Sequence, residues 1–308
     1  MKPRPRGRAP RLVVEAGLVD EGFVAVAGAD EVGRGCLAGP VTVGVVVVDP
    51  AAGMPPRGLR DSKLLTPQQR RALVPRIQRW VLASSVASAT AEEIDTYGII
   101  AALRLAAHRA LAGLPAVPDA VLLDGNHDYL TPRPPRVPAD QLALEVEVGE
   151  VVPARPEPEP VPLPRHPFVR TRVKADLTCA SVAAASVLAK TSRDEVMVGL
   201  AGEHPGYGWE VNKGYATPYH RAALRRLGPS PYHRVSWRLG LDELGVDDLG
   251  YDIGEELGEG LGEGFEDELG GAVGGAVGLA EDSIDLDHAV GDADGQDGVV
   301  RLDEEVRR

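Results

Sequence analysis

Segments rich in β-branched residues alternate with helical patterns along most of this chain, and this alternation constrains the fold more than any other feature of the sequence. Strands are predicted at residues 23–29, 41–48, 81–90, 120–123 and 168–173. Helices are predicted from Thr66 onward, at 99–111, at 178–200 and from Thr217 to about 227. Such alternation is typical of α/β proteins, in which helices cover a sheet. We therefore predict an α/β domain.

Two of the predicted helices have clear starting signals. Thr66 is followed by Pro67 and, three residues on, by Gln69, which together are typical of a capping box with proline in the first turn. Thr217 and Pro218 begin the other helix in a similar way. Pro75 is expected to kink or split the first of these helices, because proline removes a backbone hydrogen bond.

The charge of the chain is divided between two parts. The whole sequence of 308 residues has a formal net charge of −13. Residues 241–308 contain 22 acidic and 3 basic residues, so this segment has a net charge of −19 and residues 1–240 have a net charge of +6. A basic body fits an anionic partner such as nucleic acid. Most single arginines are nevertheless expected to lie on solvated surface.

Several classes of protein are excluded by composition. The apolar run at 41–48 is too short to cross a bilayer. No apolar stretch follows the basic residues near Met1, so no secretory signal is predicted. Cys36 and Cys179 are too few for a disulfide framework. We predict a soluble, cytoplasmic protein with no membrane partner.

Three segments flank or interrupt the predicted α/β body at 22–240. The basic, proline-rich segment 1–21 is expected to be loosely ordered. Residues 131–167 are proline-rich and are expected to form an inserted surface loop, with room for one short strand at 142–148. The acidic, glycine-rich tail at 241–308 is expected to be disordered.

Four carboxylates are predicted at the ends of strands. Asp30 and Glu31 follow the first strand, Asp124 ends a later one, and Asp176 falls between the last strand and the alanine-rich helix. Such oxygen ligands suit Mg²⁺ or Mn²⁺, and two such ions can activate water and stabilise the leaving oxygen of a phosphodiester. Adjacent strand residues point to opposite faces, so Asp30 and Glu31 can share a site only where the strand ends or bulges.

The glycines beside the acidic pair do not form a known nucleotide loop. The segment GADEVGRGCLAGPV has neither the Gly-Lys-Ser/Thr of a P-loop nor a G-x-G-x-x-G pattern. It does place Gly33-Arg34-Gly35 one residue after the two acids. This backbone can approach a ligand closely, with an arginine beside it.

The chain resembles the ribonuclease HII family, which is the type 2 ribonuclease H family. The matching text is ADEVGRGCLAGPV, LRDSKLLTPQQR, LLDGN, KADLTCASVAAASVLAKTSRD and NKGYATPYHRAALRRLGPSPYHRVSW, in that order. The resemblance covers roughly residues 22–240. It implies a ribonuclease H-like fold, with a five-stranded mixed sheet flanked by helices and with helical C-terminal elements.

The resemblance also implies roles for particular residues. It makes Asp30, Glu31, Asp124 and Asp176 the catalytic, metal-binding acids for two Mn²⁺ or Mg²⁺ ions. Gly33, Arg34 and Gly35 would sense the ribose 2′-hydroxyl, and Tyr215 would stack on the sugar beyond the RNA-to-DNA junction. The remaining candidate substrate or phosphate contacts are Lys63, Ser181, Lys190 and Lys213.

The implied activity is hydrolysis of the RNA strand of RNA–DNA hybrids and cleavage 5′ to single ribonucleotides in duplex DNA. The products would carry 3′-hydroxyl and 5′-phosphate ends, and the role would be ribonucleotide excision and primer removal. The ribose 2′-hydroxyl is the group that separates RNA from DNA. A monomer is expected from the resemblance, and no sliding-clamp motif appears near Arg308.

Two other functions are compatible with parts of the sequence. The related ribonuclease HIII family has a separate N-terminal domain, whereas here about 20 residues precede the first predicted strand. A catalytically silent nucleic-acid-binding module would use the basic body without the four acids.

The tail could compete with nucleic acid for the basic body, or it could serve solubility alone. The 52-residue spacing from Asp124 to Asp176 is longer than the family pattern because of the insert.

Overall fold

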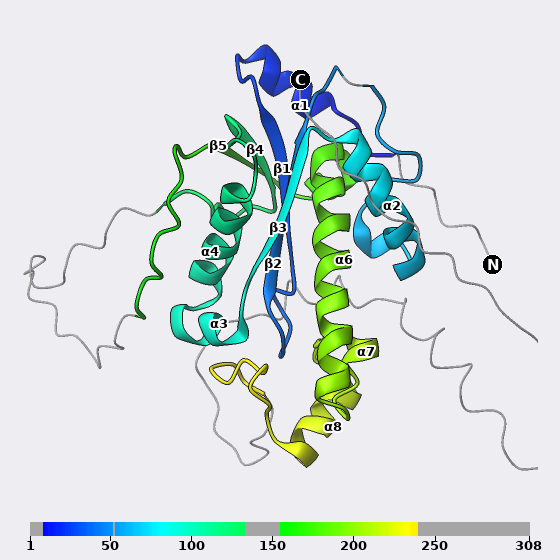
Figure 1. The fold of residues 1–308 in the computed structure, drawn as a ribbon, viewed down its shortest axis with the longest axis vertical. Coiled ribbons are helices and arrows are strands. Elements are labelled where there is room, and N and C mark those ends of the chain that lie inside the picture. Colours follow the sequence, from blue (N-terminus) through cyan, green and yellow to red (C-terminus); the bar gives the residue numbers. More distant parts are fainter. Residues whose placement is uncertain (1–8, 52, 133–154, 240–308) are drawn as a thin grey trace, which may run out of the picture. The chain divides into compact units, whose positions relative to one another are not determined.

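A five-stranded mixed sheet forms the centre of the computed structural model, which describes residues 9–51, 53–132 and 155–239 (Figure 1). The strands are β1 (Val26–Val32), β2 (Val41–Val48), β3 (Ala83–Ala89), β4 (Ala120–Asp124) and β5 (Phe168–Arg172). Their order is β3-β2-β1-β4-β5. The β1–β2 and β2–β3 pairs are antiparallel, whereas β1–β4 and β4–β5 are parallel. The predicted α/β class and mixed sheet are confirmed.

Helices cover both faces of this sheet (Figure 1). The longer ones are α1 (Val13–Asp20), α2 (Pro67–Trp80), α4 (Ile99–Ala112), α6 (Ala180–Glu203) and α8 (Pro218–Leu227). The short ones are the 3₁₀ helix η1 (Ser62–Leu64), α3 (Ala91–Tyr97), α5 (Ala175–Thr178) and α7 (Trp209–Asn212). Helix α4 lies on one face of the sheet, and α6, with α2 beside it, lies on the other. Helices α7 and α8 are the helical C-terminal elements that the resemblance implied. Local sequence patterns predicted α8, but they did not predict α3, α5 or α7.

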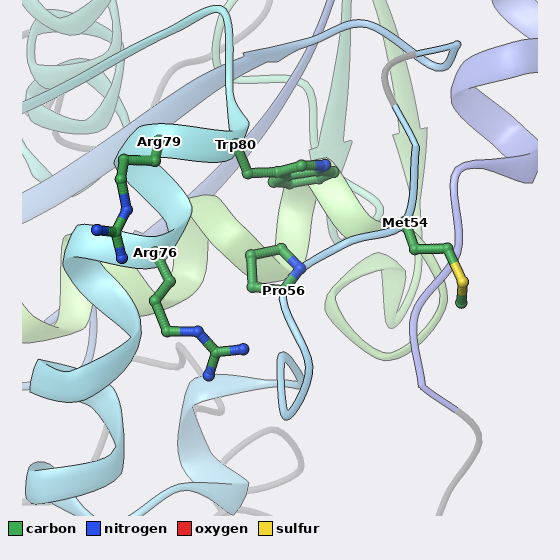
Figure 2. A pocket seen from close by; sticks show the side chains of 5 residues that line it. All are labelled: Met54, Pro56, Arg76, Arg79 and Trp80. Carbon is green, nitrogen blue, oxygen red and sulfur yellow. The ribbon is translucent and has the colours of Figure 1, made fainter.

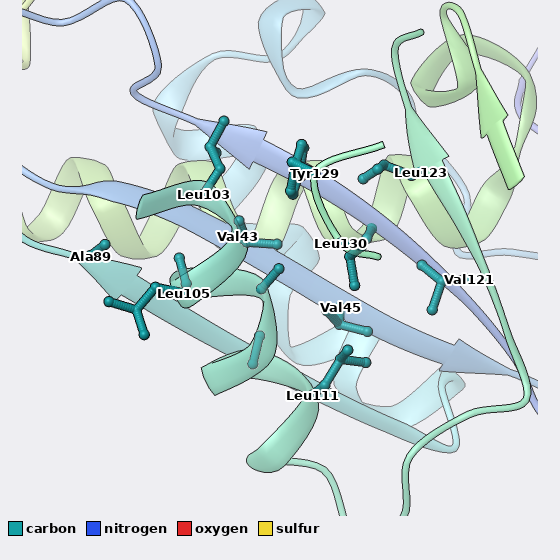
Figure 3. Packing of buried hydrophobic residues seen from close by; sticks show 14 of the residues in the cluster. Val43, Val45, Ala89, Leu103, Leu105, Leu111, Val121, Leu123, Tyr129 and Leu130 are labelled. Carbon is teal, nitrogen blue, oxygen red and sulfur yellow. The ribbon is translucent and has the colours of Figure 1, made fainter. Parts of the chain in front are cut away.

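The two faces of the sheet are buried in different ways. On the α4 face, valines of β2 pack with leucines of α4 and with Tyr129 and Leu130 (Figure 3). On the α6 face, the helix approaches the strands very closely. A Cβ atom at Gly44 would lie 2.6 Å from the Ala185 carbonyl oxygen, so only glycine fits there. Small residues on both sides therefore bring α6 directly over β1 and β2.

The capping box that begins α2 is confirmed. The Thr66 hydroxyl accepts a hydrogen bond from the Gln69 backbone N–H at 3.2 Å, and the Gln69 side chain accepts one from the Thr66 N–H at 2.9 Å. The helix continues through Pro75, so the predicted split does not occur. Leu73 and Ile77 are buried on either side of the proline, and their packing offsets the lost hydrogen bond.

The prediction of a loosely ordered N-terminal segment is wrong for the described residues 9–20. Helix α1 buries Leu18 fully, and the Glu15 carboxylate accepts hydrogen bonds from the Ser181 N–H at 2.9 Å and the Ser181 hydroxyl at 2.7 Å. Because these partners lie 166 residues apart in the sequence, local composition could not indicate this helix.

The proline-rich insert is described only in part. Residues 133–154, which include the candidate strand at 142–148, lie outside the described residues, as does the acidic tail. From 155 to 167 no regular element forms, as predicted, but Val161 and Leu163 pack against the core on the α4 face. No helix in the described part of the chain is long and apolar enough to cross a membrane.

Candidate active site

Asp30 and Glu31 lie within β1, not after it as predicted. Both residues keep regular antiparallel pairing, with Gly44 and Val43 respectively. Their side chains therefore point to opposite faces of the sheet. Asp30 points toward α6 and Ser186, whereas Glu31 points toward Tyr129 on the α4 side. No bulge brings the two together, so a shared site depends on how close they lie to the end of the strand.

The other two acids come from the neighbouring strand and the helix that follows it. Asp124 is the last residue of β4, which runs parallel to β1, and its Oδ1 accepts a hydrogen bond from the Ala175 N–H at 2.7 Å. Asp176 follows in α5 and is buried. The bond to Ala175 thus ties the end of β4 to the start of α5 and brings Asp124 and Asp176 to the same edge of the sheet.

Electrostatics shows that the carboxylates act on one another. Burial raises the pKa of Asp30 well above its usual value, and the charges of Glu31, Asp124 and Asp176 raise it further, against hydrogen bonding by Ser186. Burial and then repulsion from Asp61 and Asp124 raise the pKa of Asp176 to about 7. These shifts reflect buried negative charges with too little positive charge nearby.

Lys63 and Asp61 complete the charges at this edge. Burial works to lower the pKa of Lys63, but the carboxylates of Asp61, Asp30 and Asp176 outweigh it and the pKa is raised. The predicted residue Lys63 is therefore within electrostatic reach of the acids. Asp61 was missed by the sequence reasoning, although it stands two residues before Lys63. It is buried, and it caps η1 by accepting a hydrogen bond from the Lys63 N–H at 2.9 Å.

Glu31 has partners of its own on the other face of the sheet. The Tyr129 hydroxyl donates a hydrogen bond to Oε2 at 3.1 Å, and the Arg34 guanidinium lies 3.8 Å from Oε1. Burial raises the pKa of Glu31, although Arg34 and Tyr129 both act to lower it. Tyr129, which holds this carboxylate in place, was not predicted from the sequence.

The four predicted acids suit a divalent cation by their chemistry. Carboxylate oxygens are the ligands that Mg²⁺ and Mn²⁺ prefer, and the raised pKa values of Asp30 and Asp176 indicate that positive charge would be stabilising here. In the described part of the chain, no three His, Cys, Asp or Glu side chains already lie close enough to form a ready-made metal-binding group. A cation would have to draw the acids together or bind some of them through water, which Mg²⁺ commonly retains.

Two buried arginines shape the loop that contains Gly33, Arg34 and Gly35. The Arg234 guanidinium donates to the carbonyl oxygens of Gly33 at 2.6 Å, Arg34 at 2.8 Å and Gly39 at 3.0 Å. Arg193 lies behind the loop. A Cβ atom at Gly33, whose φ is +85°, would meet the Arg193 Nε at 2.1 Å. The loop therefore needs glycine at this position, both for its backbone conformation and for this contact.

Arg193 also joins this loop to the loop that contains Tyr215. Its guanidinium donates to the carbonyl oxygens of Pro40 at 2.8 Å, Ala38 at 3.0 Å and Lys213 at 2.9 Å. Arg193 and Arg234 are both fully buried, which contradicts the expectation that most arginines lie on solvated surface. The only feature of the sequence that could have indicated their burial is that both lie in segments that match the family.

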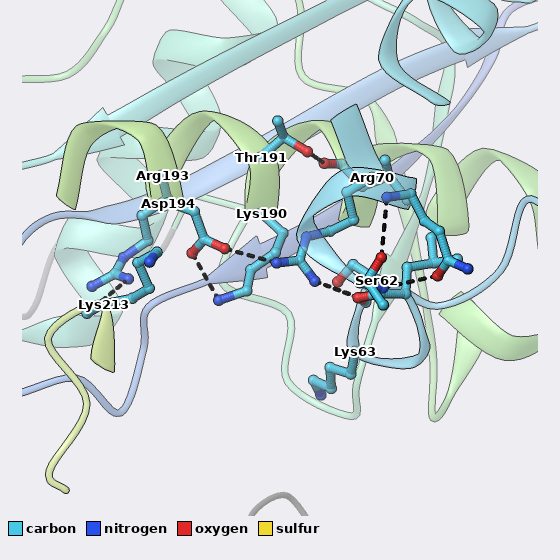
Figure 4. Close-up of polar contacts among 12 residues, drawn as sticks. Ser62, Lys63, Arg70, Lys190, Thr191, Arg193, Asp194 and Lys213 are labelled. Carbon is cyan, nitrogen blue, oxygen red and sulfur yellow. Dashed lines mark hydrogen bonds and ion pairs between the residues drawn. The ribbon is translucent and has the colours of Figure 1, made fainter. Parts of the chain in front are cut away.

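Tyr215 and Lys190 lie together beside this loop. The Lys190 ammonium is 5.3 Å from the centre of the Tyr215 ring and forms a 2.8 Å ion pair with Asp194. The other oxygen of Asp194 accepts a 2.9 Å bond from Arg70 of α2 (Figure 4). Asp194 thus holds the Lys190 ammonium beside the Tyr215 ring, and a direct phosphate contact by Lys190 stays a prediction.

The remaining predicted contacts have different outcomes. Ser181 is fully buried and its hydroxyl is already bonded to Glu15, so its contact with substrate finds no support here and stays a prediction. It fixes α1 to the start of α6. Lys213 has a positive φ of 50° and its ammonium donates to the Glu210 carbonyl, which places it at the turn before Tyr215. Its contact with substrate stays a prediction, as do those of Gly35 and Arg34.

A pair of buried histidines contacts the backbone of the loop that contains Tyr215. His220 Nδ1 lies 2.8 Å from the Tyr215 carbonyl oxygen, and its Nε2 lies 3.1 Å from the Nε2 of His233. His233 Nδ1 accepts from the Ser230 N–H at 2.9 Å. The Trp209 Nε1–H also donates to His220 Nε2 at 3.1 Å, so this nitrogen is an acceptor. Both rings are then neutral, with His220 donating from Nδ1 and His233 donating from Nε2.

We expect this pair to make folding sensitive to mild acid. Burial and then the neighbouring His220 lower the pKa of His233 from 6.5 to about 4. Below pH 6.5 the unfolded chain therefore gains a proton that the folded protein resists. The stabilisation is complete above this pH and is lost as the pH falls toward 4, by about 3 kcal/mol. Urea unfolding across this range should show the loss, and His233→Gln should have a shallower pH dependence; equal slopes would contradict the assignment.

The fold and the site define a class, namely α/β proteins with interacting carboxylates at the ends of neighbouring strands, whose oxygen atoms suit divalent cations. Residues 27–239 match the family model described as ribonuclease HII. The chain belongs to the ribonuclease HII family. It is therefore a ribonuclease H, a metal-dependent hydrolase whose substrates are RNA–DNA hybrids.

Individual relatives are similar over most of the chain. The ribonuclease HII of Streptomyces avermitilis is 44% identical over 217 residues, which cover 70% of this chain and 78% of the relative. The ribonuclease HII of a Ruegeria species is 42% identical over 229 residues, covering 74% and 84%. Among solved structures, the ribonuclease H2 from Pyrococcus horikoshii OT3 covers 70% of this chain and 95% of that chain, with a TM-score of 0.49 and 25% identity.

Proposed function

We propose that this ribonuclease HII cuts 5′ to single ribonucleotides embedded in duplex DNA as well as within longer hybrids, leaving 3′-hydroxyl and 5′-phosphate ends. The observation that carries the proposal is the position of the glycine loop. Gly33, Arg34 and Gly35 follow the acidic pair after a single residue, Val32, and the carbonyls of Gly33 and Arg34 are bound by the buried Arg234. A backbone fixed in this way can test for a single 2′-hydroxyl next to the acids.

In this proposal the acids hold two divalent cations, Mn²⁺ or Mg²⁺. Asp30, Glu31, Asp124 and Asp176 would be the ligands. When bound, the cations supply charge that activates a water molecule and stabilises the departing 3′ oxygen.

The other side chains of the site bind and orient the substrate. Lys63, at the edge of the acid cluster, would contact a phosphate next to the cut. Tyr215 would stack on the sugar beyond the junction, held by the cation of Lys190 on its ring and by Arg193. Because Arg193 bonds to both loops, the two parts of this ribose-recognition site would move as one unit.

The test is cleavage of three otherwise identical duplexes: DNA with one ribonucleotide, an RNA–DNA hybrid, and DNA alone. We expect a cut 5′ to the ribonucleotide and cuts along the hybrid with Mn²⁺ or Mg²⁺, and none in DNA alone or in EDTA. Extension by a polymerase and ligation would identify the two ends. Identically purified Asp124→Asn protein controls for contaminating nuclease. Tight binding without cleavage under either metal would favour a binding module and contradict the proposal.

A further inference from the structure

A strongly basic surface adjoins the acid cluster on the α2 side. From Arg57 to Arg79 the sequence has seven basic residues and a single acidic one, Asp61, which is buried. The side chains of Arg57, Arg76 and Arg79 are exposed, and Arg60 is half-buried. We refer to these four arginines as the α2 basic surface.

Within the described residues, none of the four arginines has a protein partner. No hydrogen bond or ion pair joins them to another described residue, whereas their neighbour Arg70 is paired with Asp194 at 2.9 Å. Their charges are therefore available to an anion outside the described residues. Arginine suits phosphate in particular, because its planar fork of N–H donors binds two oxygens at once.

The α2 basic surface is hollowed in two places that share Arg76. Besides Arg76, the first hollow is lined by Arg57 and Arg60 of the preceding loop, by Leu64 of η1 and by Gln69 in the first turn of α2. The second is lined by Met54, Pro56, Arg79 and Trp80. Figure 2 shows Arg76 and Arg79 projecting from α2, and the ring of Trp80 beside Pro56. Together the two hollows run along much of α2, so an elongated ligand could lie along this helix.

This surface is continuous with the proposed cleavage site. Leu64, which lines the first hollow, directly follows Lys63, whose ammonium interacts with Asp30 and Asp176. Helix α2 has 14 residues, which corresponds to a length of about 21 Å. A strand of DNA spans that distance with about six phosphates.

We propose that the α2 basic surface binds the phosphodiester backbone of one arm of the duplex substrate, beginning next to the phosphate at Lys63. This proposal rests on the proposed function, since the duplex must already lie across the acids. Phosphate contacts of this kind position a duplex without reading its sequence. The surface would thus add affinity for long substrates and leave the recognition of ribose to the glycine loop and Tyr215.

The test compares wild type with the double variant Arg76→Gln/Arg79→Gln on duplexes that carry one ribonucleotide. One duplex has short arms of about four base pairs, and two others extend a single arm to about 14 base pairs, well beyond the reach of α2. We expect the KM of the variant to rise about tenfold for one of the two extended duplexes only. Binding measured by anisotropy in EDTA should show a salt dependence that is weaker by about two phosphate contacts.

The matched control is Arg165→Gln/Arg170→Gln, which removes the same charge at and just before the edge strand β5. These two arginines form ion pairs with Asp119 and Glu21 and lie partly exposed, where such pairs contribute little. Equal effects of the two double variants, or equal effects on both extended arms, would overturn the proposal, as would an unchanged salt dependence.

The experiment also separates the two proposals. If wild type fails to cut any duplex, the proposed function fails, and the salt dependence in EDTA still reports on the α2 basic surface. If wild type cuts and the double variant binds and cuts the long duplexes as wild type does, only the surface proposal fails.

Discussion

Asp30→Asn should abolish cleavage and at the same time stabilise the metal-free protein. Asp30 is 8% exposed, and the other three acids of the site all act on its charge. Replacing the carboxylate would remove a proposed metal ligand, which we expect to lower kcat by at least about a thousandfold. It also removes a buried like charge, which should raise the free energy of unfolding by about 1–2 kcal/mol without metal.

Two measurements check this prediction together. Single-turnover cleavage gives the loss of activity, and thermal unfolding in EDTA should show a melting temperature higher by about 2–8 °C. Adding Mg²⁺ or Mn²⁺ should stabilise wild type more than the variant, because wild type gains more from neutralisation. Glu195→Gln, at an exposed position of α6, is the control for a simple change of charge. A variant that loses both activity and stability would show that Asp30 is needed for the fold instead.

Arg234→Lys should damage ribonucleotide recognition while it retains the charge. Lysine cannot replace the donors that Arg234 directs at the carbonyls of Gly33, Arg34 and Gly39. Buried carbonyls left without a donor cost about 1–3 kcal/mol each, so the melting temperature should fall. We expect kcat/KM on a single-ribonucleotide duplex to fall about a hundredfold, as small misplacements in a site can cause.

The positioning role has a readout that general destabilisation would not produce. At temperatures where the variant remains folded by circular dichroism, its preference for ribonucleotide-containing duplex over DNA alone should weaken in binding as well as in cleavage. Arg170→Lys, at a partly exposed position paired with Glu21, should behave as wild type. If Arg234→Lys loses stability but keeps the full preference for ribonucleotides, the loop does not depend on this guanidinium.

Local patterns in the sequence were sufficient for the class of fold and for much of its outline. The strand at 41–48 has the predicted bounds, and the capping box at Thr66 forms as expected. These features depend on neighbouring residues, namely on apolar runs and on a hydroxyl three residues from a glutamine. The carboxylates of the candidate site were also chosen from the sequence, and the match to the ribonuclease HII family supports that choice without testing each residue.

Tertiary contacts decided what the sequence could not. Glu15 and Ser181 order a helix in a segment that appeared too basic and proline-rich to fold. Arg193 and Arg234 are indistinguishable in composition from surface arginines, yet both are fully buried because backbone carbonyls converge on them. The regular pairing of β1 places Asp30 and Glu31 on opposite faces. The sequence by itself determined which side chains could bind metal and phosphate, because residue type sets their chemistry. Only packing between distant segments determined which are buried, paired or free to act.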